Sequence, residues 1–140
     1  MHYLTTKIMF SSFHRLWNPK FSDLENEEIY QECFRGHGHN YVLEVTVNVL
    51  EVTVKGQPHP QTGMVMDIKR LNKLLMREVH TLVDHKSLND DVEFLKGVIP
   101  TAENVSQGIW SLLKNKLQDA DLYRIKLMES ERNIVEYFGE

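Results

Sequence analysis

The chain has 140 residues, of which 41% are apolar and 26% are charged, and its formal net charge is −4. This size and composition predict one soluble globular domain over residues 1–140, and the negative charge disfavours nucleic acid as a main partner. No apolar run approaches the roughly 18 residues of a membrane span, which disfavours a membrane protein. The single cysteine excludes an intramolecular disulfide and the first ten residues lack a signal-peptide pattern, so we expect a cytoplasmic protein.

A strand is predicted first, over residues 3–14. Leu4, Ile8 and Phe10 share one face by the two-residue period of a strand, and the same face ends at His14. The polar stretch WNPKFSDLENEE follows and predicts a loop with a helical turn near its end.

The second predicted strand covers residues 41–54. Its apolar residues alternate, but the alternation changes phase near Leu50, which indicates a β-bulge. The first apolar face contains Tyr41, Leu43, Val45, Val47 and Val49, and the second contains Val52 and Val54.

Two amphipathic helices are predicted next. The first lies within residues 64–85, and the second begins after Pro100, with Thr101 as its N-cap and Glu103 in its first turn. The first apolar stripe is Ile68, Leu71, Leu75, Val79 and Leu82, and the second is Val105, Ile109, Leu112 and either Lys116 or Leu117.

Two short strands, over residues 122–129 and 133–139, complete the order β-β-α-α-β-β. This order predicts an α+β fold in which two helices pack on one face of an antiparallel sheet.

The segment GHGHNY, residues 36–41, indicates a metal site. His37 and His39 are two residues apart, so both would point the same way on extended backbone, and Gly38 leaves room for close approach. His14 offers a third imidazole. Three histidines with an open fourth position are typical of catalytic zinc, although imidazole also suits copper, iron and nickel. The alternative is that these histidines are polar surface residues.

Cys33 lies four residues before His37, at the entry to the same strand. A thiolate beside a metal could bind it, attack a carbon atom or remove a proton. The alternative is a small buried apolar residue.

Asp84 and His85 follow the first helical pattern. A carboxylate close to an imidazole raises its basicity, so the pair predicts an acid–base unit. Adjacent residues do not face each other on a helix, so this unit requires the helix to break there, and a solvated helix end is the alternative.

Glu129 continues the apolar face of Tyr123, Ile125 and Leu127. A carboxylate on a buried face needs a partner, and two adjacent N–H groups of an aminopyrimidinone ring would suit it. The alternative is that the strand ends at Met128 and Glu129 faces water.

Seven motifs in this order resemble the 6-pyruvoyl-tetrahydropterin synthase family, which includes the 6-carboxy-tetrahydropterin synthases. They are FSSFHRL, CFRG, GHGHNY, TGMVMDIKRLN, VDHKSLN, PTAENV and MESERNIVEYFGE. The resemblance implies three zinc ligands, three catalytic residues and two pterin contacts. These are His14, His37 and His39 as ligands, Cys33, Asp84 and His85 as the catalytic group, and Thr101 and Glu129 as the contacts.

The resemblance also implies the tunnelling fold, in which a four-stranded antiparallel sheet carries two antiparallel helices. In that fold the sheets join edge to edge into a barrel and two trimers form a hexamer. Sites then lie between subunits, so Cys33 would face Asp84 and His85 of a neighbouring chain. The implied activity is that of a zinc-dependent lyase, which releases triphosphate from 7,8-dihydroneopterin triphosphate.

The two branches of the family differ in product. The short spacing from Cys33 to His37 is similar to the carboxy-forming branch, which favours 6-carboxy-tetrahydropterin with acetaldehyde, as in the queuosine pathway. The loop after His14 and the C-terminal ERNIVEYFGE resemble the pyruvoyl-forming branch of tetrahydrobiopterin synthesis, which is the alternative. Ala102 departs from a threonine often found in the family. Two other hypotheses are a pterin-binding module without turnover, which Cys33 disfavours, and an activity like that of dihydroneopterin aldolase.

Overall fold

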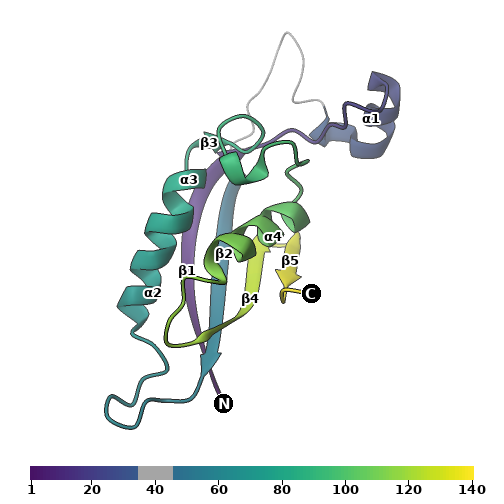
Figure 1. Cartoon of the computed structure of the whole chain (residues 1–140). Coiled ribbons are helices and arrows are strands. Elements are labelled where there is room, and N and C mark those ends of the chain that lie inside the picture. The colour runs from purple at the N-terminus through teal and green to yellow at the C-terminus, as the bar shows by residue number, and fades with distance from the viewer. Residues whose placement is uncertain (35–45) are drawn as a thin grey trace.

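A computed structural model of the chain describes residues 1–34 and 46–140 (Figure 1). Its elements are β1 His2–Phe13, α1 Asp23–Tyr30, the 3-10 turn η1 Gln31–Cys33, β2 Thr46–Gly56, α2 Ile68–Leu75, the π-helical turn η2 Met76–His80, α3 Thr81–Val83, β3 Lys86–Ser87, the 3-10 turn η3 Glu93–Leu95, α4 Ala102–Leu113, β4 Asp121–Met128 and β5 Ile134–Tyr137. No helix in these two ranges is long and apolar enough to cross a membrane.

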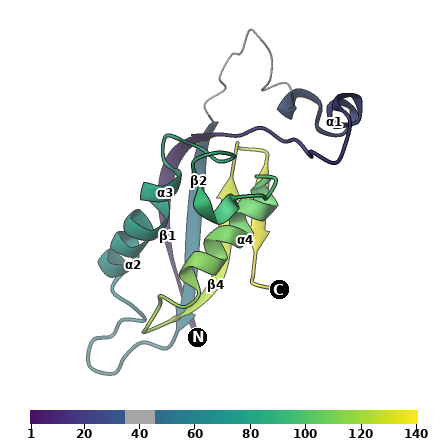
Figure 2. The same ribbon diagram turned by 45° about the horizontal axis from the view of Figure 1, so that its top comes forward.

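One sheet with the strand order β3-β1-β2-β4-β5 forms the centre of the fold. The pairings β1–β2, β2–β4 and β4–β5 are antiparallel, and α2 and α4 lie on the same face of the sheet (Figures 1 and 2). The predicted α+β class is therefore confirmed. The predicted four-stranded sheet gains a short fifth strand, because the chain after α3 runs parallel to the end of β1, with Ser12 opposite Lys86 and Phe13 opposite Ser87.

The β-bulge predicted near Leu50 is wrong. The register of β1 with β2 runs without interruption from Thr46 to Gly56. The core-facing side of β2 is Asn48, Leu50, Val52 and Val54, all of which are buried. The Asn48 side-chain amide donates to Ser12 Oγ at 2.8 Å, and this bond offsets the cost of burying a polar group. Residues 41–45 of the predicted strand lie outside the described residues.

A bulge does occur between β2 and β4. Thr53 lies opposite Arg124 and Val54 lies opposite Leu122, so Tyr123 is the extra residue. The bulge changes the phase of β4, and Leu122 packs against the core where the sequence pattern predicts Tyr123. Tyr123 instead contacts the rings of Tyr3 and Phe138, with centroid separations of 4.6 and 5.6 Å.

The first predicted helix is interrupted by the π turn η2, whose hydrogen bonds span five residues where those of an α-helix span four. The α2 residues Leu71 and Leu75 are buried as predicted, and Val79 follows them in η2. Beyond the π turn, Val83 is fully buried and Leu82 is 42% exposed, so the predicted place of Leu82 in the stripe is wrong.

Helix α4 begins as predicted. The Thr101 side-chain oxygen accepts a hydrogen bond from the Asn104 backbone N–H at 3.3 Å, which caps the helix. Its buried residues are Ala102, Val105, Ser106, Ile109 and Leu113, with Leu113 in the place predicted for Leu112.

The polar segment after β1 forms a full helix, α1, where the sequence pattern predicts a loop with one helical turn. Ser22 and Glu25 form a capping box, in which each side chain accepts a hydrogen bond from the other's backbone N–H. Asn26 is buried, and its amide binds the backbone of Asn18, Phe21 and Ser22. These bonds fold the segment on itself, away from the sheet (Figure 1).

The shift of phase at the π turn predicts unequal effects of two neighbouring substitutions. Val83→Ala is expected to lower the free energy of unfolding by about 2 kcal/mol, because buried methyl groups are lost and a cavity is left. Leu82→Ala is expected to change it by less than about 0.5 kcal/mol, since the side chain is exposed. Urea unfolding of both variants measures the difference. A larger loss for Leu82→Ala would contradict the observed helix phase.

Candidate active site

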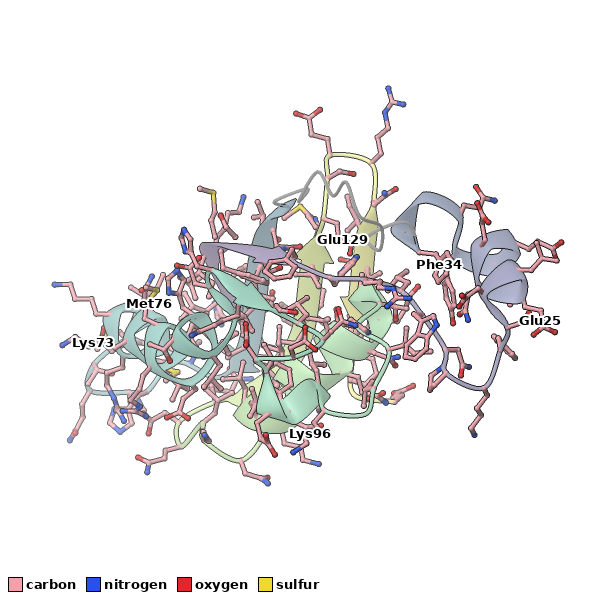
Figure 3. All side chains as sticks on the ribbon, turned by 90° about the horizontal axis from the view of Figure 1, so that it is seen from above. Glu25, Phe34, Lys73, Met76, Lys96 and Glu129 are labelled. Carbon is pink, nitrogen blue, oxygen red and sulfur yellow. The ribbon has the colours of Figure 1, made fainter. Side chains whose placement is uncertain are left out.

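The candidate site lies where β1 and β4 end and where the chain leaves α3. His14 follows the last residue of β1, and Glu129 follows the last residue of β4. Asp84 and His85 connect α3 to β3, which pairs with the end of β1. Figure 3 views this end of the molecule and labels Glu129 near the sheet and Phe34 near α1.

His14 and Glu129 lie next to each other. His14 Nε2 is 3.9 Å from Glu129 Oε1, and the two side chains are 19% and 25% exposed. Burial lowers the pKa of His14, and the Glu129 carboxylate opposes this effect by raising it. The net result favours neutral imidazole, which is the form that binds a metal ion.

Glu129 is held at the mouth of the β4–β5 turn. Its backbone N–H donates to the Asn133 carbonyl at 3.1 Å, and the Ser130 hydroxyl accepts from the N–H groups of Arg132 and Asn133. The carboxylate continues the face of the buried residues Ile125 and Leu127. Glu129 is thus half-buried beside an imidazole, in agreement with the predicted face.

The helix breaks at Asp84, as an acid–base pair requires. Asp84 has extended backbone, and His85 has a φ of 57°, in the left-handed region. With these backbone conformations, His85 Nδ1 lies 2.8 Å from Asp84 Oδ2. Asp84 is 24% exposed, and His85 is 80% exposed.

Backbone and imidazole groups surround the Asp84 carboxylate. The Ser11 backbone N–H donates to Oδ1 at 2.9 Å, and His80 Nε2 lies 3.8 Å from Oδ2. The Ser11 hydrogen bond and then the His85 contact lower the pKa of Asp84. His80 was not among the predicted site residues, although its spacing of four residues from Asp84 was a usable signal.

Cys33 is exposed at the end of η1. Its carbonyl accepts a hydrogen bond from the Leu16 backbone N–H at 3.1 Å, which places the Cys33 segment beside the chain that follows His14. The predicted interpretation of Cys33 as a buried apolar residue is therefore wrong.

The described part of the chain does not bring together all the predicted site residues. The predicted ligands His37 and His39 lie outside it, and it contains no group of three or more His, Cys, Asp or Glu residues that could hold a metal ion. Among the described elements, α1 contacts only η1, and Figures 1 and 2 show α1 and α3 on opposite sides of the molecule. The turn η1, which ends at Cys33, contacts neither α3 nor β3, the elements on either side of Asp84 and His85.

The described hydrogen bonds of Thr101 join it to residues close by in the chain. Its side chain caps α4, and its backbone N–H donates to the Ile99 carbonyl at 2.8 Å. In the ranges that the structure describes, no hydrogen bond joins Thr101 to His14, Asp84 or Glu129. Its predicted contact with a pterin stays a prediction.

Comparison with known proteins matches the whole length of the chain. The family described as 6-pyruvoyl tetrahydropterin synthase matches residues 3–140. A 6-pyruvoyl tetrahydrobiopterin synthase of Dictyostelium discoideum is 44% identical over 137 residues, which are 98% of this chain and 96% of the relative. The solved structure of the Caenorhabditis elegans 6-pyruvoyl tetrahydropterin synthase is 35% identical, with a TM-score of 0.84 over 100% of this chain and 98% of that one. A putative 6-carboxy-5,6,7,8-tetrahydropterin synthase of Archaeoglobus fulgidus is 34% identical over 114 residues, 81% of this chain and 85% of the relative.

The lowered pKa of Asp84 predicts how its contribution to stability depends on pH. The folded-state pKa lies below the ordinary value of 3.8, so the ionised carboxylate stabilises the fold above that pH, and the effect is lost as the pH falls through the folded pKa. Asp84→Asn keeps an oxygen for Ser11 but removes the charge. Its melting temperature is expected to lie below that of the wild type near neutral pH, and the difference is expected to shrink below about pH 4.

Thermal unfolding at several pH values measures this difference. Asp121→Asn, at the exposed start of β4, is the matched control. A difference for Asp84→Asn that stays constant down to about pH 2 would contradict the prediction, because the carboxylate would then contribute nothing that depends on its charge.

Proposed function

The chain belongs to the 6-pyruvoyl tetrahydropterin synthase family, and from this premise we propose that it converts 7,8-dihydroneopterin triphosphate to 6-pyruvoyl-tetrahydropterin with release of triphosphate. The observation that carries the proposal is the 44% identity, over 98% of the chain, to a relative named for the pyruvoyl activity. The bonded Asp84–His85 pair, 2.8 Å apart, supports acid–base chemistry at this site.

The proposed product, 6-pyruvoyl-tetrahydropterin, differs from the product that the spacing of Cys33 and His37 favours. That spacing predicts 6-carboxy-tetrahydropterin, but the relative named for the carboxy product is less similar and matches a shorter part of the chain than the Dictyostelium relative. The number of residues between a thiol and a metal ligand limits the distance between them without determining their positions. Similarity along the whole chain therefore outweighs one short segment, and 6-carboxy-tetrahydropterin becomes the second candidate.

We further propose that His14, His37 and His39 hold a zinc ion. Three imidazoles are the donor set of a catalytic zinc site, and the half-buried His14, with its lowered pKa, fits this role. When bound, zinc supplies Lewis-acid chemistry, which makes the hydrogens of the substrate side chain more acidic.

The chain's own residues would move the protons. Cys33 would take a proton from the substrate side chain and return one at another carbon atom. With Asp84 ionised, His85 Nδ1 is the donor in this contact, so the neutral form of the imidazole would have Nε2 to accept a proton. Electrons lost by the side-chain carbon atoms would reduce the pterin ring, so the reaction needs no external oxidant.

Glu129 would orient the substrate. Its two carboxylate oxygens can accept parallel hydrogen bonds from the guanidine-like edge of a pterin. Its half-buried place beside His14 would put the pterin near the proposed metal, where the substrate side chain reacts.

Two chains would contribute to one site. Within one chain, η1, which ends at Cys33, contacts neither α3 nor β3, and the His85 side chain is 80% exposed. A neighbouring chain that brought its Cys33 to this imidazole would complete the catalytic group, as the family resemblance implies.

The product assay tests the proposed function. Purified protein loaded with zinc is expected to convert 7,8-dihydroneopterin triphosphate to a pterin with the mass of 6-pyruvoyl-tetrahydropterin, with one triphosphate and no acetaldehyde. Trapped acetaldehyde in equal amount to the pterin would support the 6-carboxy product. Tight pterin binding without turnover would refute both and indicate a binding module.

Subunit complementation tests the shared site. Cys33→Ala and His85→Ala are each expected to lose about 10²–10⁴-fold in turnover, since each lacks one proton-transfer group. Mixed assemblies of the two variants are expected to recover about a quarter of wild-type turnover, because random mixing pairs an intact Cys33 with an intact His85 at that frequency.

The control mixes Cys33→Ala with the double variant Cys33→Ala/His85→Ala, in which no intact pair can form. Zinc content should stay the same in Cys33→Ala, because the thiol is proposed as a base and not as a ligand. No recovery in the first mixture would place the complete catalytic group within one chain.

A further inference from the structure

Arg15 lies between the segments that carry the proposed catalytic residues. It follows His14, and its backbone is held by the side chain of Asn89, downstream of Asp84 and His85. The Arg15 N–H donates to Asn89 Oδ1 at 2.8 Å, and Asn89 Nδ2 donates to the Arg15 carbonyl at 2.9 Å. The chain after β1 is thereby tied to the chain after β3.

The Arg15 side chain reaches the segment that carries the thiol. Its guanidinium carbon lies 4.9 Å from the centre of the Trp17 ring and 5.1 Å from that of the Phe34 ring. These are cation–π distances, and a planar guanidinium can stack on an aromatic face. Phe34 is the residue next to Cys33, so the contact lies one residue from the sulfur.

A backbone hydrogen bond supports the same connection. The Leu16 N–H donates to the Cys33 carbonyl at 3.1 Å. Helix α1, which precedes Cys33, contacts no strand among the described elements. Among the described contacts, those with residues that follow β1 hold the Cys33 segment beside the sheet, and the Arg15–Phe34 contact is the one between side chains.

We propose that Arg15 is a positioning residue for Cys33, which acts through Phe34 to fix the thiol-bearing segment beside the end of β1. The proposal rests on the proposed function for the role of Cys33 in turnover. The Asn89 side chain holds the backbone of Arg15. Arg15 therefore connects the segment that carries Cys33 with the segment that follows Asp84 and His85.

Substitution of Arg15 and Phe34 tests this proposal. Arg15→Met keeps the length of the side chain but removes its charge and plane, and Phe34→Leu removes the ring. Each is expected to lower kcat by about 10–10²-fold with little change in KM and in zinc content, because a misplaced proton-transfer group slows chemistry and not binding. Arg15→Lys, which keeps the charge, is expected to recover part of kcat.

The double variant tests whether the two residues act together. If Arg15 acts through Phe34, the variant Arg15→Met/Phe34→Leu should lose no more kcat than the worse single variant. Hydrogen exchange at the backbone amides of residues 16 and 31–34 should be faster in Arg15→Met, with exchange in α4 unchanged. This readout does not depend on turnover, so it separates a failure of this proposal from a failure of the proposed function.

Arg70→Met is the matched control, because Arg70 is an exposed arginine on α2 that pairs with Asp119. This variant should keep kcat and hydrogen exchange unchanged. Unchanged exchange and kcat in Arg15→Met would overturn the proposal. Additive losses in the double variant would overturn it too, because Arg15 would then act by a route other than Phe34. Zinc loss in proportion to kcat would instead assign Arg15 to the support of His14. If Arg15→Met does not fold, Phe34→Leu carries the same test.

Discussion

The chain leaving α3 runs beside the last residues of β1, and the hydrogen bonds between these segments hold the candidate site together. Ser11 takes part with both of its backbone polar groups. Its N–H donates to the Asp84 carboxylate, and its carbonyl accepts from the His85 N–H. Leu88 continues the pairing through Phe13. The helix must end at Val83 for these bonds to form, and the left-handed backbone of His85 turns the chain toward β1.

Burial and charge act in opposite directions on the pKa of His14. His14 is partly buried at the end of the core face of β1, which lowers its pKa, while Glu129 at 3.9 Å partly offsets this effect. Protonation of His14 would strengthen its attraction to Glu129 but would remove the lone pair that a metal needs. The balance favours a neutral imidazole, which is the form that the proposed zinc site requires.

The proposed sharing of the site between chains also agrees with the edges of the sheet. In the described sheet, β3 at one edge has two residues and β5 at the other has four. Edge strands have backbone groups that another strand can pair with, and assembly of several sheets into a barrel would use them. The projecting α1 and the exposed Cys33 would then lie near a neighbouring chain, where the exposed His85 is available.

Local chemistry in the sequence was sufficient to predict much of the fold. The alternation of β1, the cap at Thr101 and the order of the elements depend on residues that are neighbours in the chain, and so do the adjacency of Asp84 and His85 and the face of Glu129. The capping box of α1 was also readable, because Ser22 and Glu25 have the spacing that such a box requires.

Tertiary structure decided the rest, for a physical reason. The π turn and the bulge at Tyr123 each insert one residue and so change which side chains face the core, and neither leaves a periodic signal in the sequence. The pairing of β3 with β1, the approach of His14 to Glu129 and the contact of Arg15 with Phe34 join residues far apart in the chain or across a turn. Their distances depend on how the whole chain packs, which no local spacing determines.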